Sequence, residues 1–310
     1  MVSIPMRTKF RGLTNREAVI FKGERWSEFS PFPEYSDQEA SQWLKAAISF
    51  SNSELPEVKR DEIRVNATLP AVEVSDIESV LHRFGKFETV KLKVAEKGET
   101  LNDDLARIRE VARLYPNSRL RLDANGGYSI EQALDLVEKL ADFNIEYLEQ
   151  PVSSLADMAN LRAELNGRYL ICADELIRKS TDPLTVAQAG AADLVMLKAQ
   201  PLGGVAAALS LSRQIGLRSV VSSAIETSVG LAMGVHLACA LDELEFDCGL
   251  GTANLLSGDI AKNPVSPVDS ILRPTTVEID PDLLEKYSAS PDRQEFWRNR
   301  VARCLELLQS

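Results

Sequence analysis

Five charged residues recur along the chain at a nearly constant interval, and each of them ends a short apolar run. They are Lys93, Asp123, Glu149, Asp174 and Lys198. The intervals of 24 to 30 residues fit one strand, one helix and two short loops, which is the repeating unit of a β/α barrel. The strands of such a barrel are parallel and its active site lies at their C-terminal ends, so we expect the five side chains to meet at one mouth.

The three acids come from consecutive repeats, so we expect them to stand side by side. Carboxylates this close repel one another unless a cation joins them. Oxygen ligands favour Mg²⁺, with Mn²⁺ as an alternative, whereas Zn²⁺ prefers His or Cys ligands. We therefore predict one divalent cation bound by Asp123, Glu149 and Asp174.

Two lysines flank the predicted metal site. Lys93 belongs to the second strand and Lys198 to the sixth, which puts them on opposite walls. A metal-bound carboxylate makes the carbon next to it acidic, and a neutral lysine can then remove the proton. The ordinary lysine pKa of about 10.4 must fall for this. Lys91 shares a face of the strand with Lys93 and offers the nearby positive charge that lowers its pKa, and Arg121 shares a face with Asp123.

The elements that position these residues follow the same interval. We expect eight strands, ending near residues 69, 93, 123, 149, 174, 198, 222 and 248, with helices between them. Residues 62–264 then form an α/β fold, a modified (β/α)8 barrel of the TIM type. Residues 1–61 and 265–310 do not follow the interval, and they predict a small α+β capping domain built from both ends of the chain.

The overall composition narrows the possible partners. The net charge of −11 argues against a broad nucleic-acid surface, which would need a basic face. No apolar run is long enough to span a membrane, and we see no secretory signal at the N-terminus. Four cysteines without a paired spacing favour a reduced, cytoplasmic protein. We expect a small-molecule carboxylate as the partner, and a monomer is compatible with the sequence.

Short motifs around the charged residues resemble those of the enolase superfamily, in its muconate-lactonizing subgroup. The motifs are Lys91-Leu92-Lys93, Asp123-Ala124-Asn125-Gly126, Glu149-Gln150-Pro151, Ala173-Asp174-Glu175 and Leu197-Lys198. Within that subgroup the chain is most similar to the o-succinylbenzoate synthase family of menaquinone biosynthesis. The likeness extends over nearly the whole chain, including the predicted cap.

The resemblance implies a lyase that performs the Mg²⁺-dependent syn dehydration of 2-succinyl-6-hydroxy-2,4-cyclohexadiene-1-carboxylate to 2-succinylbenzoate. It implies that Lys93 removes the proton α to the carboxylate and that Lys198 holds the anionic intermediate by charge and cation–π contact. It also implies supporting roles for Asn125 and Glu175. The substrate contacts that it suggests are Arg121, Ser222, Ser223, Gly249, Leu250, Gly251, Phe10 and Arg11.

Two other functions remain open from the residues alone. A racemase of N-acylamino acids, or an epimerase of dipeptides, would use the same two opposed lysines to exchange protons on either face of a carbon. A non-catalytic metal-binding barrel is an alternative of another class. Such a protein is expected to lack one of the two catalytic lysines, and this chain has both Lys93 and Lys198.

Overall fold

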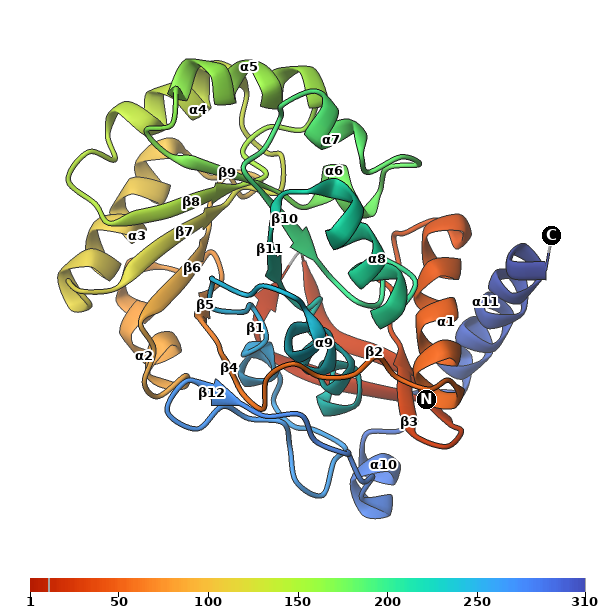
Figure 1. Ribbon diagram of the computed structural model, residues 1–310. Coiled ribbons are helices and arrows are strands. Elements are labelled where there is room, and N and C mark those ends of the chain that lie inside the picture. Colours follow the sequence, from red (N-terminus) through yellow and green to blue (C-terminus); the bar gives the residue numbers. More distant parts are fainter. Residues whose placement is uncertain (11, 310) are drawn as a thin grey trace.

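A three-stranded antiparallel sheet and one long helix form the first part of the chain (Figure 1). The structure is a computed structural model, and it describes residues 1–10 and 12–309. The strands, in the order β1-β2-β3, are Val2–Phe10, Leu13–Lys22 and Trp26–Phe29. Helix α1, Asp37–Asn52, begins at Ser36, whose side chain and Glu39 form a capping box.

The last helix of the chain, α11 (Pro291–Gln309), lies beside α1 in Figure 1. Its Trp297 is fully buried and stands edge-on to Phe29, with 5.8 Å between the ring centroids. The indole nitrogen of Trp297 donates a hydrogen bond to Glu17 on β2. The two ends of the chain therefore share one small α+β unit, residues 1–52 and 291–309, which we call the cap.

Seven parallel strands form a second, curled sheet in which sequence order and spatial order agree. The strands are β5 Ala67–Leu69, β6 Thr89–Lys93, β7 Arg119–Asp123, β8 Ile145–Glu149, β9 Leu170–Ala173, β10 Leu194–Leu197 and β11 Arg218–Val221. The register pairs Lys93 with Asp123, and Asp123 with Glu149, across neighbouring strands. Three of the predicted site residues are therefore aligned by backbone pairing alone.

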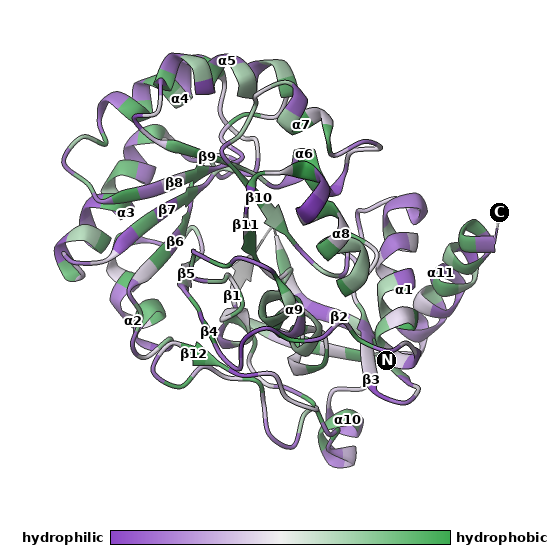
Figure 2. Ribbon diagram, in the orientation of Figure 1, coloured by the Kyte–Doolittle hydropathy of each residue, from purple (hydrophilic) through white to green (hydrophobic). Residues whose placement is uncertain are grey.

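Helices surround the outer side of this sheet, and in Figure 2 they carry both hydrophobic and hydrophilic residues, as expected of helices with one face on a core. They are η1 Val74–Asp76, α2 Ile77–His82, α3 Leu101–Leu114, α4 Ile130–Glu138, α5 Leu155–Leu165, α6 Glu175–Arg178, α7 Thr185–Gln188, α8 Val205–Ile215 and α9 Ser228–Ala240. Helix α9 is buried along almost its whole length because it packs against both β3 of the cap and β11. Among the described residues no helix is long and apolar enough to cross a membrane.

Among the described residues, the eighth strand that the sequence predicts near residue 248 is not formed as a continuous strand. Single parallel bridges join Cys248 to Val65 and Gly249 to Ser222, one at each edge of the seven-stranded sheet. A side chain at Gly249 would collide with the Ser222 hydroxyl. Glycine at this close approach weakens a strand, and the pairing there is limited to isolated bridges.

The segment between the sheet and α11 runs along both parts of the molecule. Strand β12, Ile271–Leu272, pairs with β4, Ile63–Arg64, directly before the first strand of the curled sheet. Isolated bridges join Leu256 and Ser288 to β1 of the cap. This segment also contains η2, Thr252–Leu255, and α10, Pro281–Lys286.

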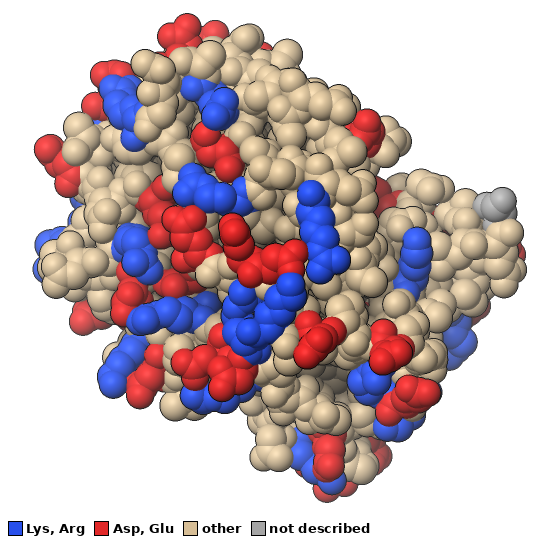
Figure 3. Space-filling model, in the orientation of Figure 1, with Lys and Arg blue, Asp and Glu red and all other residues tan. Residues whose placement is uncertain are grey.

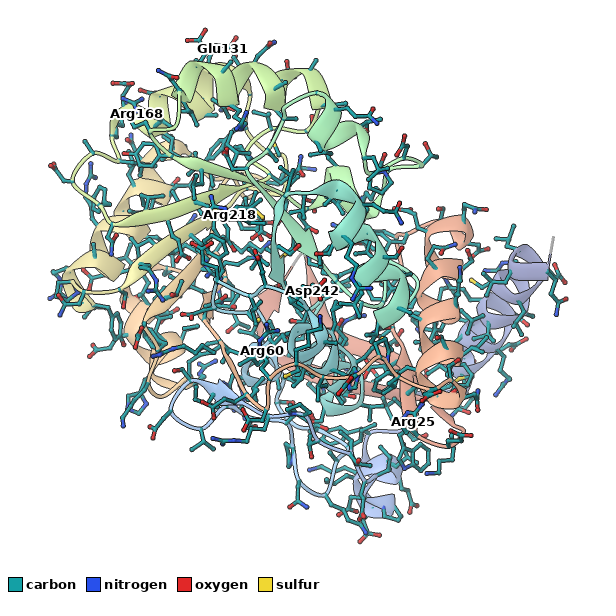
Figure 4. All side chains as sticks on the ribbon, in the orientation of Figure 1. Arg25, Arg60, Glu131, Arg168, Arg218 and Asp242 are labelled. Carbon is teal, nitrogen blue, oxygen red and sulfur yellow. The ribbon has the colours of Figure 1, made fainter. Side chains whose placement is uncertain are left out.

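Charged side chains of both signs interleave over the middle of the face shown in Figure 3. Arg218, the first residue of β11, is labelled in the same orientation in Figure 4. This face is therefore the end of the sheet at which the strands begin. Ion pairs cross it between Arg64 and Glu88, and between Arg119 and both Glu146 and Asp247. The predicted site lies at the opposite end of the strands.

Candidate active site

Alternate residues of the strands point into the ring and form two layers of side chains. The layer at the C-terminal ends contains Lys93, Asp123, Glu149, Asp174, Lys198 and Ser222. The layer beneath it contains Lys91, Arg121, Tyr147, Cys172, Met196 and Val220. Lys93, Asp123 and Glu149 are the last residues of their strands, whereas Asp174 and Lys198 come directly after theirs. The structure brings all five residues of the sequence interval to one end of the sheet.

The lysines and acids of the site are paired with one another at short distance. Lys91 Nζ lies 2.6 Å from Glu149 Oε1 and 2.9 Å from Asp123 Oδ2. Lys93 Nζ lies 2.5 Å from the same Asp123 oxygen, and Lys198 Nζ lies 2.6 Å from Asp174 Oδ2. The three acids and the other two lysines are almost completely buried, and the side chain of Lys198 is 11 % exposed. Burial without such pairing would leave each charge strongly destabilised.

The pairing gives the two neighbouring lysines opposite properties. Burial lowers the pKa of Lys93, and the charge of Lys91 lowers it further, while Asp123 acts against both. Burial also opposes the charge on Lys91, but Asp123 and Glu149 outweigh it and raise the pKa of Lys91 well above its ordinary value. Lys91 therefore keeps its proton, and Lys93 is the member of the pair that can give its proton up.

The three acids also differ from one another. Burial, followed by the nearby Asp123, raises the pKa of Glu149 to about 7. Burial acts the same way on Asp123, but Lys91 and Lys93 outweigh it and hold its pKa well below the ordinary value. Lys198 and then Arg178 outweigh burial at Asp174 and lower its pKa. The three pKa shifts therefore differ in direction, because the nearby cationic side chains outweigh burial at Asp123 and Asp174 but not at Glu149.

The three acids differ from a preformed metal site in geometry but not in donor chemistry. Among the described residues, no three His, Cys, Asp or Glu side chains are grouped closely enough to hold an ion as they stand. Ammonium groups lie against Asp123, Glu149 and Asp174 instead. Glu149 Oε2 is nonetheless buried without a hydrogen-bond partner, and the carboxylates supply the oxygen donors that Mg²⁺ prefers. The residues fit the cation in chemistry.

Asn125 and Glu175 form a chain of contacts behind the site. Lys93 Nζ donates to Asn125 Oδ1 at 2.6 Å, and Asn125 Nδ2 donates to Glu175 Oε1 at 3.1 Å. Asn125 holds a left-handed backbone with a φ of 48°, which asparagine tolerates better than most residues. These two residues therefore connect Lys93 to the loop that carries Asp174.

A cavity opens over these groups and extends to the cap. Its walls are formed by Phe32, Tyr35, Trp43, Thr68, Lys91, Lys93, Asp123, Asn125, Arg178, Lys198, Ser222, Ser223, Ala224, Ile225 and Thr252. Sequence reasoning missed Arg178, whose Nε donates to Asp174 and whose Nη1 donates to the Tyr35 hydroxyl of the cap. Its place four residues after Asp174, one helical turn away, was the available signal.

Several predicted substrate contacts lie elsewhere. Arg121 is fully buried one layer beneath the mouth, where it donates to Glu146, Asn66 and the Asp247 carbonyl and lies over the Tyr147 ring. This corrects the prediction of a substrate contact for Arg121. Strand alternation identifies the face of a residue, but two residues along a strand also change its depth by roughly 6.6 Å.

The serines and glycines of the last repeats separate in the same way. Ser222 and Ser223 line the cavity, and Ser223 Oγ shares a hydrogen bond of 2.6 Å with Thr252. Gly249, Leu250 and Gly251 do not line it: Gly249 lies against Ser222, Leu250 against Gly234 of α9, and Gly251 against Asn66 and Phe84. The side chain of Phe10 and all of Arg11 lie outside the described residues.

The arrangement is suited to moving a proton next to a carboxylate. Three strands separate β6 from β10 in the sheet, yet Lys93 and Lys198 line the same cavity. The acids lie on the strands between them. A substrate in this cavity would have one amine at each side and Asp123 in the wall between them.

Solved structures similar to this chain share its fold. A muconate lactonizing enzyme from Pseudomonas fluorescens, complexed with muconolactone, matches with a TM-score of 0.78 and 19 % identity, over 92 % of this chain and 96 % of that chain. An N-succinyl Arg/Lys racemase from Bacillus cereus matches with a TM-score of 0.78 and 18 % identity, over 93 % and 96 %. At these identities the likeness concerns the fold alone.

Family models and relatives give a closer assignment. Residues 74–282 match the model described as enolase C-terminal domain-like, and residues 1–51 match the enolase N-terminal domain-like model. The chain, whose sheet ends in lysines and acids beneath a cap, is thus an enolase-superfamily protein. An o-succinylbenzoate synthase of Mycobacterium ulcerans is 44 % identical over 99 % of this chain and 93 % of its own length, and that of Mycobacterium tuberculosis is 43 % identical over 99 % and 94 %. The chain belongs to the o-succinylbenzoate synthase family.

Proposed function

We propose that this protein is a lyase that dehydrates 2-succinyl-6-hydroxy-2,4-cyclohexadiene-1-carboxylate to 2-succinylbenzoate, in the cytoplasm and as a step of menaquinone biosynthesis. The observation that carries the proposal is the pair of lysines that line one cavity with the acids between them. The family of the relatives supports the choice of substrate. The single bridges at Cys248 and Gly249 support a ring that closes as a modified barrel.

Lys93 is the base in this proposal. Its buried amine has a lowered pKa, and Asp123 and Asn125 fix its position at the end of β6. It removes the proton α to the carboxylate, and the same ammonium then delivers a proton to the departing hydroxyl on the same face of the ring. Loss of water makes the ring aromatic, so the first proton transfer is the step at which the protein has most to contribute.

Lys198 has a different task, because it stands at the other wall. Its ammonium lies against Asp174 and faces the cavity, where it can stabilise the negative charge that develops on the substrate. Asp123, Glu149 and Asp174 would hold Mg²⁺, or Mn²⁺ in its place. The chemistry that such an ion supplies is neutralisation of the substrate carboxylate, which makes the adjacent proton more acidic.

The direct test is an assay of purified protein with Mg²⁺ and the cyclohexadiene substrate. Formation of the aromatic product is followed by ultraviolet absorbance and verified by mass spectrometry. Turnover supports the proposal. An inert protein in this assay contradicts it and favours the non-catalytic metal-binding protein if it still binds Mg²⁺.

The second candidate is racemisation of an N-acylamino acid, and the two opposed lysines favour it. Replacing Lys198 by Arg separates the two chemistries, because racemisation requires a proton from each wall whereas dehydration requires charge alone at Lys198. We expect Lys198→Arg to lower racemisation at least about tenfold more than dehydration, a difference of roughly 1.4 kcal/mol in barrier height. Equal loss of both activities would show that Lys198 transfers a proton in both.

A further inference from the structure

Arg16 of the cap contacts both walls of the cavity without lining it. It lies on β2 and is only 1 % exposed. Its Nε donates to the carbonyl oxygens of Ala224 and Ile225, at 3.3 and 3.2 Å, on the loop that follows β11. Its Nη2 donates to the Ser30 carbonyl oxygen, and its guanidinium lies 4.4 Å from the centre of the Phe32 ring. One buried cation therefore joins a cap segment to a loop of the sheet.

The contacted residues are those that shape the apolar part of the cavity. Phe32 lines it from the cap, and Ala224 and Ile225 line it from the loop. Ile225 has a left-handed backbone with a φ of 63°, which is unusual for a β-branched residue and persists only where surrounding contacts enforce it. The hydrogen bonds from Arg16 to the Ala224 and Ile225 carbonyl groups are such contacts.

Two buried acids also fix this loop, Glu28 from the cap and Glu226 from within the loop itself. Glu28, on β3, accepts hydrogen bonds from the Thr227 backbone and hydroxyl and from the Gly230 backbone. Glu226 accepts one from the Ala224 backbone. Both acids are buried, and both attract Arg16 electrostatically. Buried charges are strongly unfavourable unless they are paired, so this cluster imposes one geometry on the loop.

We propose that Arg16 is a positioning residue for substrate discrimination, which holds Phe32 and the Ala224–Ile225 segment at the separation that fits the side chain of the substrate. The proposal rests on the proposed function, because the side chain in question is the succinyl group. Arg16 touches no reacting atom. Its effect reaches the substrate through the two apolar walls.

The test compares Arg16→Met and Arg16→Lys with the wild-type enzyme. Loss of hydrogen bonds to a buried charge weakens an interaction by roughly 10- to 100-fold, so we expect KM for the dehydration substrate to rise by about that factor in Arg16→Met. We expect kcat to change less than about threefold, because Lys93 and the acids are not contacted. Arg16→Lys keeps the positive charge but loses the planar guanidinium with its several N–H donors, so we expect a KM between those of the wild type and Arg16→Met.

Arg25→Met is the matched control. Arg25 is also a cap arginine that donates to backbone carbonyl groups, those of Phe50 and Ser53, but it does not line or brace the cavity. Its variant is expected to keep the wild-type KM. Thermal unfolding of all variants shows which of them remain folded at the assay temperature.

Ligand binding provides a second readout that does not depend on turnover. Calorimetry with 2-succinylbenzoate and with benzoate, which lacks the side chain, should show weaker binding of 2-succinylbenzoate alone in Arg16→Met. An equal loss of binding affinity for both ligands, or a fall in kcat at unchanged KM, would overturn the positioning role. If Arg16→Met does not fold, the same comparison in Phe32→Leu decides, because that variant removes the ring and keeps the guanidinium. An inactive wild-type enzyme would instead refute the proposed function.

Discussion

Lys93 is the residue on which the proposed reaction depends most. Its replacement by Ala removes the base but leaves Lys91 to neutralise Asp123 and Glu149, so the fold and the acids should persist. We expect kcat to fall by about 10²- to 10⁴-fold, the usual contribution of a positioned base. Steady-state kinetics measure the loss, and calorimetry with Mg²⁺ checks that the acids still bind the ion. Activity within a few fold of wild type would exclude Lys93 as the base.

Glu28 gives the protein a pH dependence that is independent of turnover. Burial, opposed by hydrogen bonds from Ser30 and Thr227, raises its pKa from 4.5 to about 7, with Glu226 adding to the rise and Arg16 lowering it. Between these two pH values the folded protein binds a proton that the unfolded chain has released. The contribution of Glu28 to the free energy of unfolding therefore decreases as pH rises from about 4.5 to about 7, by up to about 3 kcal/mol.

Replacement of Glu28 by Gln isolates this contribution, because the amide cannot ionise. The free energy of unfolding of Glu28→Gln, minus that of the wild type, is expected to increase by up to about 3 kcal/mol between pH 5 and pH 8. Urea unfolding of both metal-free proteins at intermediate pH values measures the difference. A difference that stays constant with pH would show that the Glu28 carboxylate is ionised throughout this range.

The positions that the sequence predicted correctly are those that the strand interval determines. Lys93, Asp123 and Glu149 end successive strands, and backbone register alone aligns them. Arg16 and Glu28 could not be recognised in this way, because their partners lie about 200 residues away in the chain and meet them only across the interface between cap and sheet. The cap does not follow the strand interval of the sheet, so contacts between the two leave no regular spacing in the sequence of either one.

At the scale of elements, helix α11 is attached by its aromatic face. Trp297 is fully buried between Phe29 and Phe296, and its nitrogen is bonded to Glu17. Truncation to Ala leaves a cavity and removes one hydrogen bond to Glu17, and we expect the free energy of unfolding to fall by about 3–5 kcal/mol. Leu305→Ala on the same helix is the control, since Leu305 is 36 % exposed and should change stability far less. Similar losses in urea unfolding for both variants would argue against this anchor.

Strand prediction succeeded where one strand and one helix alternate, and it failed where the chain departs from that unit. All seven strands of the curled sheet end within one residue of the predicted positions. The predicted first strand, which ends near residue 69, is formed only over Ala67–Leu69, and the preceding Ile63–Arg64 pairs with β12 from the tail. The segment near residue 248 bridges both edges through single residues, and glycines follow it. Pairing with a distant tail and a close approach at glycine are tertiary events that local periodicity does not report.

At the scale of the whole molecule, the two ends of the curled sheet carry different kinds of ion pair. At the end where the strands begin, exposed arginines pair with acids across the face shown in Figure 3. At the other end the paired charges are buried under the cap, which supplies Phe32, Tyr35 and Trp43 to the cavity. Arg178 and Arg16 each join the cap to this end of the sheet. Binding of a cation at the acids should therefore stabilise the folded molecule as a whole.

Magnesium binding is the measurable consequence of this coupling. An ion that binds the folded protein alone stabilises it by RT ln(1 + [L]/Kd), which is about 2.7 kcal/mol at a free concentration of 100 Kd. We expect thermal unfolding to move to higher temperature as Mg²⁺ is added and to return when a chelator removes it. Glu149→Gln should lose most of this shift, because it removes the charge of a buried carboxylate with one unpartnered oxygen. Glu131→Gln, on the exposed start of α4 labelled in Figure 4, should keep the full shift, and equal shifts in both variants would remove Glu149 from the ligands.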